Sequence, residues 1–124
     1  MTGKTTLVLG ASPKPDRYSN LAVRRLREKG HEVIAVGRRA GMIADVRILD
    51  DIPSDARVDT VTIYLNEGNQ RVWEERLLKL APKRIIFNPG AENPRLAMAV
   101  GRHGIEALEA CTLVMLSTGQ YQAP

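Results

Sequence analysis

The feature that most constrains the fold is the junction between residues 5–9 and residues 10–19. The apolar run TTLVL ends at Gly10 and gives way to turn-forming residues, after which a helical pattern begins. This order predicts a strand, a tight loop and the start of a helix. In an open α/β sheet, such a loop presents free backbone N–H groups at the positive end of the helix, where a phosphate binds favourably. We therefore expect a nucleotide or a nucleotide-containing cofactor at this loop.

The rest of the chain alternates between strand and helix patterns. Strands are predicted at residues 32–36, 46–49, 60–64 and 84–87, and helices at residues 19–30, 69–80 and 93–104. Residues 105–108 and 113–116 are candidates for strands or short helices, and residues 117–124 for a frayed tail. The alternation predicts an α/β fold: a single Rossmann-like, doubly wound, mostly parallel sheet with helices on both faces, as one domain over residues 1–124.

Several residues have the chemistry of helix ends. Ser19 or Asn20 is expected to cap the first helix, and Gly30 to end it. Asn93 and Pro94 are expected at the N-cap and the first position of a later helix.

Other residues are expected to be structural. The two histidines, His31 and His103, adjoin glycines at predicted helix ends and are interpreted as exposed caps, not metal ligands. Trp73 falls on the apolar side of a predicted helix and is assigned to the core. Cys111 is the only cysteine, which excludes an internal disulfide and a thiolate zinc cage, and we expect a buried, unreactive thiol.

Composition narrows the partners. A formal net charge of +4 and a pI near 9.6 favour anionic partners. The basic residues of the first predicted helix are interspersed with Glu28, a pattern typical of a solvent-exposed helix face. Aromatic residues make up only 4% of the chain, so the sequence does not indicate a surface on which nucleic-acid bases could stack. No apolar stretch approaches the ~20 residues that cross a membrane, and no leader pattern follows Met1, so the default expectation is a cytoplasmic location without membrane contact.

The predicted strand ends favour one kind of nucleotide over others. Ligands in such sheets lie outside the carboxyl ends of the strands, here residues 10–19, 37–39, 64–67 and 88–92. The dinucleotide pattern G-x-G-x-x-G is absent. An NAD site would also need Asp or Glu after the second strand, where the chain has Gly37, Arg38 and Arg39. The two guanidiniums suit a phosphate on the ribose, as in NADP or in a 3′-phosphorylated nucleotide such as coenzyme A (CoA).

Two motifs carry a family resemblance. The pieces G-A-S-P-x-P-x-R-x-S at residues 10–19 and P-G-x-E-N at residues 89–93 resemble the small stand-alone CoA-binding proteins, which are related in fold to the CoA-binding domain of the succinyl-CoA synthetase α subunit. The match extends through residues 30–36 and 104–106 and includes Cys111. Members typically carry Val-Asn-Pro after the second strand, whereas this chain has Val36, Gly37 and Arg38.

The resemblance implies a CoA pocket. Phosphate groups would be held by Gly10, Ala11, Ser12, Arg17 and Ser19, and the adenosine part would lie against Val36, Gly37, Arg38 and Arg39. The middle of the channel would be lined by Tyr64, Leu65 and Asn66, and the pantetheine would lie near Asn88, Pro89 and Gly90.

These residues predict a protein that binds CoA or an acyl-CoA without evident catalytic machinery. The synthetase works through a phosphorylated histidine from a further domain, and Glu67 and Glu92 are interpreted as partners of helix N-termini, not as catalytic acids. A mixed disulfide between Cys111 and CoA is a second option that the resemblance leaves open. The alternative function is a small NADP-dependent oxidoreductase, although neither Tyr18 nor Tyr64 is followed by the lysine of a Tyr-x-x-x-Lys relay. A purely structural protein would leave the phosphate-type loop without a role.

Overall fold

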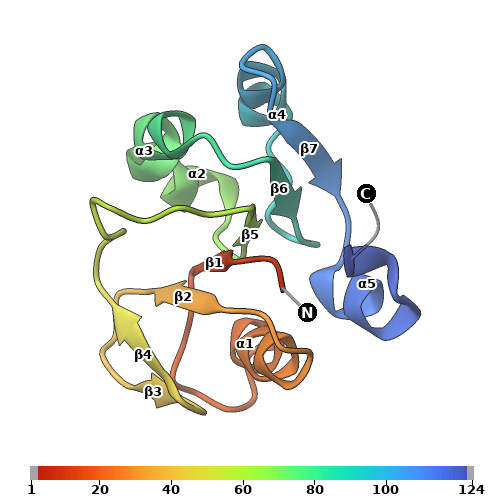
Figure 1. The fold of residues 1–124 in the computed structure, drawn as a ribbon. Coiled ribbons are helices and arrows are strands. Elements are labelled where there is room, and N and C mark those ends of the chain that lie inside the picture. The colour runs from red at the N-terminus through yellow and green to blue at the C-terminus, as the bar shows by residue number, and fades with distance from the viewer. Residues whose placement is uncertain (1–2, 123–124) are drawn as a thin grey trace.

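The computed structural model describes residues 3–122, and its central feature is a seven-stranded sheet (Figure 1). The strand order is β3-β4-β2-β1-β5-β6-β7. All neighbouring strands are parallel except β3 and β4, which are antiparallel. The strands are β1 (Thr6–Leu9), β2 (Val33–Val36), β3 (Met42–Ile43), β4 (Val46–Leu49), β5 (Thr60–Ile63), β6 (Arg84–Phe87) and β7 (Glu106–Glu109). The predicted mostly parallel α/β sheet is confirmed.

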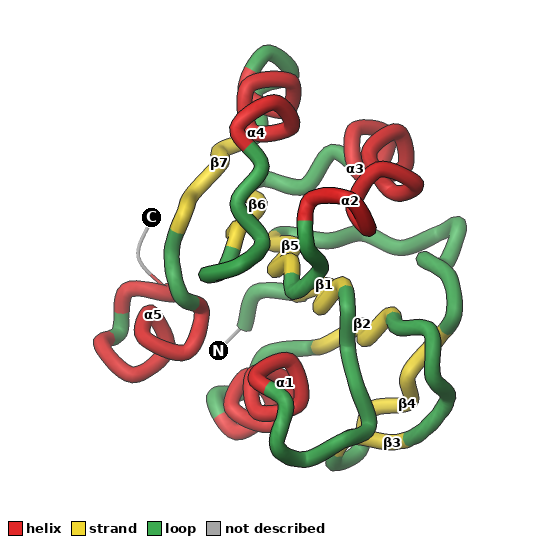
Figure 2. The backbone as a smooth tube through the Cα atoms, turned by 180° about the vertical axis from the view of Figure 1, so that it is seen from behind, coloured by secondary structure: helices red, strands yellow, loops and turns green. Residues whose placement is uncertain are grey.

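Helices cover both faces of this sheet. Figure 1 shows α1 and α5 on one face and α2, α3 and α4 on the other, and Figure 2 shows the same two layers from behind. The helices are α1 (Tyr18–Glu28), α2 (Glu67–Gln70), α3 (Glu74–Leu80), α4 (Pro94–Gly101) and α5 (Thr112–Thr118), with short 3-10 turns η1 (Arg71–Trp73) and η2 (Gln120–Gln122). The sheet is therefore doubly wound.

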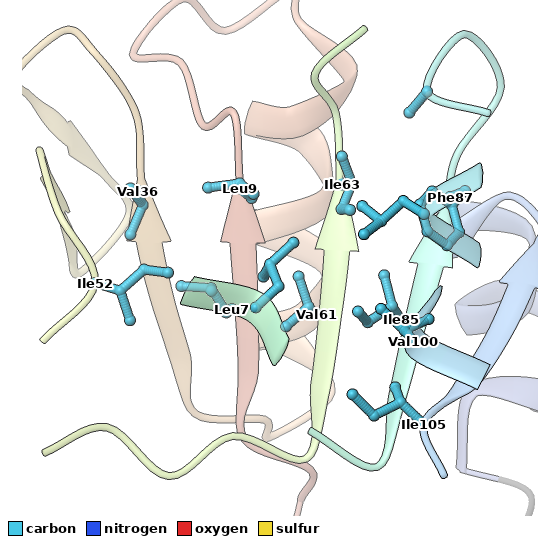
Figure 3. Close-up of a cluster of buried hydrophobic side chains, with 13 residues drawn as sticks. Leu7, Leu9, Val36, Ile52, Val61, Ile63, Ile85, Phe87, Val100 and Ile105 are labelled. Atoms are coloured by element: carbon cyan, nitrogen blue, oxygen red, sulfur yellow. The ribbon is translucent and has the colours of Figure 1, made fainter. Parts of the chain in front are cut away.

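The alternation of side chains along the strands divides the core into two layers. Successive residues of a strand point to opposite faces, so Leu7 and Leu9 pack toward α3 and α4, while Val8 packs toward α1 and α5. Figure 3 shows the first layer, in which apolar side chains of β1, β5 and β6 meet those of the covering helices. Because both faces of the central strands are buried, these strands consist mainly of apolar and β-branched residues.

The strand order fixes where a ligand can lie. The chain passes from β1 to β2 and β4 on one side, and then returns to the other side of β1 to form β5, β6 and β7. The loops that follow β1 and β5 therefore diverge, and a crevice opens at the carboxyl ends of these neighbouring strands.

Several local expectations need correction. The helix predicted over residues 69–80 is broken into α2, η1 and α3, and the short strand β3 was not anticipated. Helix α1 begins at Tyr18, with Arg17 at the N-cap and no capping side chain, so neither Ser19 nor Asn20 is the cap. The expected cap at Asn93 is confirmed, since its side chain accepts a hydrogen bond from the Leu96 N–H. Residues 106–109 form β7, and the candidate segment 113–116 lies in α5.

The expectation of an exposed His31 was wrong, whereas His103 is exposed as predicted. The His31 side chain is 0% exposed, and its Nδ1 accepts a hydrogen bond of 2.8 Å from the Lys4 N–H. Its ring meets Tyr121 edge to face with centroids 4.9 Å apart. Burial, reinforced by the charges of Lys4 and Arg84, lowers the pKa of His31 below its ordinary value of 6.5. The folded protein therefore holds this imidazole in its neutral form.

Stability should consequently fall in mild acid. Because the pKa of His31 is lower in the folded than in the unfolded chain, the unfolded chain takes up a proton first as the pH drops below about 6.5. The stabilisation is complete above this pH and is lost as the pH falls through the folded pKa, by about 1.4 kcal/mol for each unit of pKa difference. Urea unfolding between pH 7.5 and 5 should show this loss in the wild type and in His103→Gln. In His31→Gln the free energy of unfolding should depend less on pH over this range. A pH dependence equal to that of the wild type would contradict the role assigned to His31.

Candidate functional site

A cavity of about 650 Å³ opens at the carboxyl ends of β1, β2 and β5. This volume lies within the range of small-molecule sites in proteins. Its wall is formed by Leu9, Gly10, Ala11, Ser12, Pro13, Lys14, Arg17, Tyr18, Ser19, Val36, Gly37, Arg38, Arg39, Asp50, Tyr64, Leu65, Asn66, Asn69, Trp73 and Pro89. The crevice expected from the strand order is thus present.

All of the site residues predicted from the sequence line this cavity except Asn88 and Gly90. Asn88 is buried, and its amide donates to Thr62 Oγ1 at 2.7 Å and to the Ile63 carbonyl at 2.9 Å. Its Oδ1 accepts from the Thr112 N–H at 2.9 Å, so the side chain ties β6 to β5 and to α5. The Gly90 N–H donates to the carboxylate of Glu92. Both residues support the loop beyond β6 from outside the cavity.

The loop after β1 is shaped by the end of β2. The N–H groups of Gly10 and Ala11 both donate to the Val36 carbonyl, at 2.8 and 2.9 Å. The φ of Gly10 is +96°, in the left-handed region that favours glycine. These two residues line the cavity, but their N–H groups are engaged with protein. The backbone donors that remain for a ligand lie further along the loop.

The N-terminus of α1 supplies such donors. No side chain caps this helix, and no acidic residue lies in its first turn. The first N–H groups of a helix have no partner within the helix, and those of Tyr18 and Ser19 have no protein acceptor among residues 3–122. Both residues line the cavity. The cavity therefore contains the uncapped positive end of an eleven-residue helix.

A network behind the loop holds it against α1. The side chain of Asn20, which is buried, donates to the Ser12 carbonyl at 2.9 Å and accepts from Arg24 Nε at 2.9 Å. Arg24 in turn donates to the Pro15 carbonyl at 3.0 Å. The two side chains therefore hold the path of the loop between β1 and α1.

The charges around the cavity are mostly positive. Lys14, Arg17, Arg38 and Arg39 are basic, and Asp50 is the acidic residue among the lining residues. No hydrogen bond or ion pair to these basic side chains is present within the part of the chain that the structure describes. Asp50 was not identified from the sequence, because it follows β4, and only the sheet order places the end of β4 beside the end of β2.

Aromatic side chains also line the cavity. Trp73, which the sequence assigned to the core, packs on the core cluster with one side and also lines the cavity. Burial raises the pKa of the Tyr64 phenol, with the neighbouring Cys111 thiol adding to the effect, so this hydroxyl stays protonated. Cys111 itself is half-buried and is not one of the lining residues.

Residues 3–122 contain no group of three His, Cys, Asp or Glu side chains suited to a metal ion. Within the same residues, no helix has the length and apolar character needed to cross a membrane.

Comparison with known families places the chain in one of them over most of its length. The sequence model of the CoA binding domain family matches residues 4–117. The chain belongs to this family. The resemblance expected from residues 10–19 and 89–93 is confirmed, and it covers nearly the whole of this CoA-binding domain.

Solved structures support the same fold for the CoA-binding domain. An uncharacterized protein is 47% identical, with a TM-score of 0.91 over 96% of this chain and 98% of that chain. A protein from Thermus thermophilus is 22% identical, with a TM-score of 0.82 over 95% of this chain and 90% of that chain. Acetyl-coenzyme A synthetase 1 from Ca. Korarchaeum cryptofilum is 15% identical, with a TM-score of 0.72, and the match covers 88% of this chain but 26% of that one. No curated protein matches the chain.

Proposed function

We propose that this protein binds CoA or an acyl-CoA in the cavity at the carboxyl ends of β1, β2 and β5. The observation that carries the proposal is the uncapped N-terminus of α1, which opens into the same cavity as four basic side chains. CoA carries a diphosphate and a ribose phosphate, so it complements both features. Family membership supports a CoA-type ligand independently of this geometry.

The diphosphate is assigned to the first loop and the start of α1. Free N–H groups and the helix dipole stabilise an anion at this position. The Arg17 guanidinium can donate two parallel hydrogen bonds to phosphate oxygens. Because Gly10 and Ala11 already donate to Val36, we assign the direct backbone contacts to Ser12, Tyr18 and Ser19.

The ribose phosphate is assigned to Arg38 and Arg39, directly after β2. The pantetheine arm is then directed toward the other end of the cavity, along Tyr64, Leu65 and Asn66 and past Pro89. Trp73 adds an aromatic surface there. Apart from the Asp50 carboxylate, the groups that line the cavity are neutral hydrogen-bonding groups, cations and apolar walls, which supports a binding role.

A ligand panel tests the class of ligand. A ligand that binds only the folded protein raises its melting temperature by mass action. CoA should therefore raise the melting temperature more than NADP, NAD or ATP at equal concentration in a thermal shift assay. The basic pair would also suit the 2′-phosphate of NADP, so an equal or larger shift with NADP would favour the oxidoreductase alternative over CoA binding.

Replacement of Arg17 tests the diphosphate assignment. Arg17→Ala should weaken CoA binding by about 1.5 to 3 kcal/mol, the usual range for a hydrogen bond to a charged group, and leave folding stability nearly unchanged. Arg25→Ala is the matched control, because Arg25 lies on α1 outside the cavity and pairs with Glu28 at 3.1 Å. Isothermal titration should separate the two variants. Equal affinities in Arg17→Ala and the wild type would remove Arg17 from the site.

Removal of the basic pair tests the ribose phosphate assignment. The wild type should bind CoA more tightly than dephospho-CoA, by about tenfold for each 1.4 kcal/mol that the phosphate contributes. Arg38→Ala combined with Arg39→Ala should abolish this preference, whereas Arg25→Ala combined with Arg102→Ala, outside the cavity, should preserve it.

Competition titrations at low and physiological salt complete this test. If the two arginines were only solvated and did not contact the phosphate, the preference for CoA over dephospho-CoA would disappear at the higher salt concentration. The reason is that exposed charges are screened over about 10 Å at 0.1 M ionic strength. Indistinguishable affinities of the wild type for CoA and dephospho-CoA would exclude the pair from the site.

A further inference from the structure

The carboxyl ends of β2 and β4 leave the sheet side by side. Val36 and Leu49 are Cα partners in this parallel pair, and the Gly37 N–H donates to the Leu49 carbonyl at 2.9 Å. The next residues along the two strands are Gly37 and Asp50. Parallel neighbours lie about 4.8 Å apart, so Asp50 emerges next to Gly37 at the rim of the cavity.

Gly37 cannot carry a side chain at this position. A Cβ placed on it would lie 2.1 Å from the Ala11 carbonyl oxygen, closer than any real contact. In the dinucleotide-binding relatives of this fold, a carboxylate near the end of the second strand accepts hydrogen bonds from the ribose hydroxyls. In this protein the equivalent position is Gly37, where no side chain fits. The Asp50 carboxylate, which follows the neighbouring strand β4, lies beside it.

Asp50 is also free for a ligand, unlike its neighbour. Asp51 accepts hydrogen bonds from Arg76 and from the Ile52 N–H, both at 2.8 Å. Asp50 is exposed, lines the cavity, and has no hydrogen bond or ion pair among residues 3–122. Two adjacent carboxylates therefore differ in that one is held by protein and the other faces the cavity.

The charge of Asp50 restricts what it can contact. A carboxylate repels phosphate and only accepts hydrogen bonds, so it is favourable in a phosphate-binding cavity where the ligand offers a donor. At the adenosine end of CoA, the 3′-oxygen is phosphorylated and the neighbouring 2′-hydroxyl remains a donor. Arg38 and Arg39, which follow β2, and Asp50, which follows β4, present opposite charges at the same rim of the cavity.

We infer that Asp50 is a specificity residue that accepts a hydrogen bond from the free 2′-hydroxyl of the bound nucleotide. The carboxylate that contacts the ribose thus follows β4, whereas in dinucleotide-binding proteins it follows the second strand. In this protein the segment after β2 carries the two arginines instead. This inference rests on the proposed function, because it assigns a role within the same ligand site.

Isothermal titration of CoA and 2′-deoxy-CoA tests it. The wild type should bind CoA about tenfold more tightly than the deoxy analogue, equivalent to about 1.4 kcal/mol. Asp50→Ala should bind the two ligands equally, and Asp50→Asn, which keeps the shape and a weaker acceptor, should show reduced discrimination. Asp55→Ala is the matched control, because it removes the same charge from an exposed position outside the cavity and should keep the wild-type preference.

Two results would overturn the inference: a wild type that does not discriminate, and an Asp50→Ala variant that discriminates as the wild type does. The second result includes uniformly tighter binding of both ligands by Asp50→Ala with their ratio unchanged, which would show only repulsion between Asp50 and the ligand phosphates. If Asp50→Ala fails to fold, the Asp50→Asn ratio decides.

Failure of the wild type to bind CoA would overturn the proposed function instead. The role of Asp50 would then be tested with ADP and 2′-deoxy-ADP, by comparing the ratio of their affinities in the wild type with the ratio in Asp50→Ala. A wild type that binds neither of these nucleotides would overturn both proposals.

Discussion

The site depends on the close contact between the loop after β1 and the end of β2. One carbonyl, that of Val36, accepts from two successive N–H groups, and Gly37 packs against the Ala11 carbonyl so closely that only a hydrogen fits on its Cα. This contact sets the position of the loop and brings the first basic side chains after β2 to its side. The direction of α1, and hence the availability of its first N–H groups, follows from the same contact, since the loop leads directly into this helix.

At the amino ends of the strands, the side chains contact one another and the C-terminal turn η2. The buried Arg84 donates to Thr60 Oγ1 and to the Tyr121 carbonyl, both at 2.7 Å, and its guanidinium lies 4.3 Å from the centre of the Tyr121 ring. Tyr121 also shares a hydrogen bond with Thr6 and packs on His31. These polar groups at the amino ends of the strands thus hydrogen-bond to one another, and the same contacts hold η2 against the sheet.

The sequence predicts the fold where local and global signals agree. The buried strands β1, β5 and β6 have runs of apolar and β-branched residues bounded by turn residues, and the Asn93 cap has a local signature. The sequence does not predict the position of residues whose surroundings are set by contacts between distant parts of the chain. His31 follows a helix-ending glycine and resembles an exposed turn, but Tyr121, distant in the chain, covers it. Asp50 and Trp73 enter the cavity only through strand order and the break of the predicted helix over residues 69–80, neither of which has a local signature.

The uncapped start of α1 has a consequence for the energetics of the whole protein. An N-cap side chain typically stabilises a helix by about 1 kcal/mol, and this helix lacks one. An anion bound at Tyr18 and Ser19 would accept the hydrogen bonds that a cap residue normally accepts. In that state the ligand completes a secondary-structure element, and the first turn of α1 becomes the part of the fold whose local unfolding is most directly coupled to occupancy of the cavity.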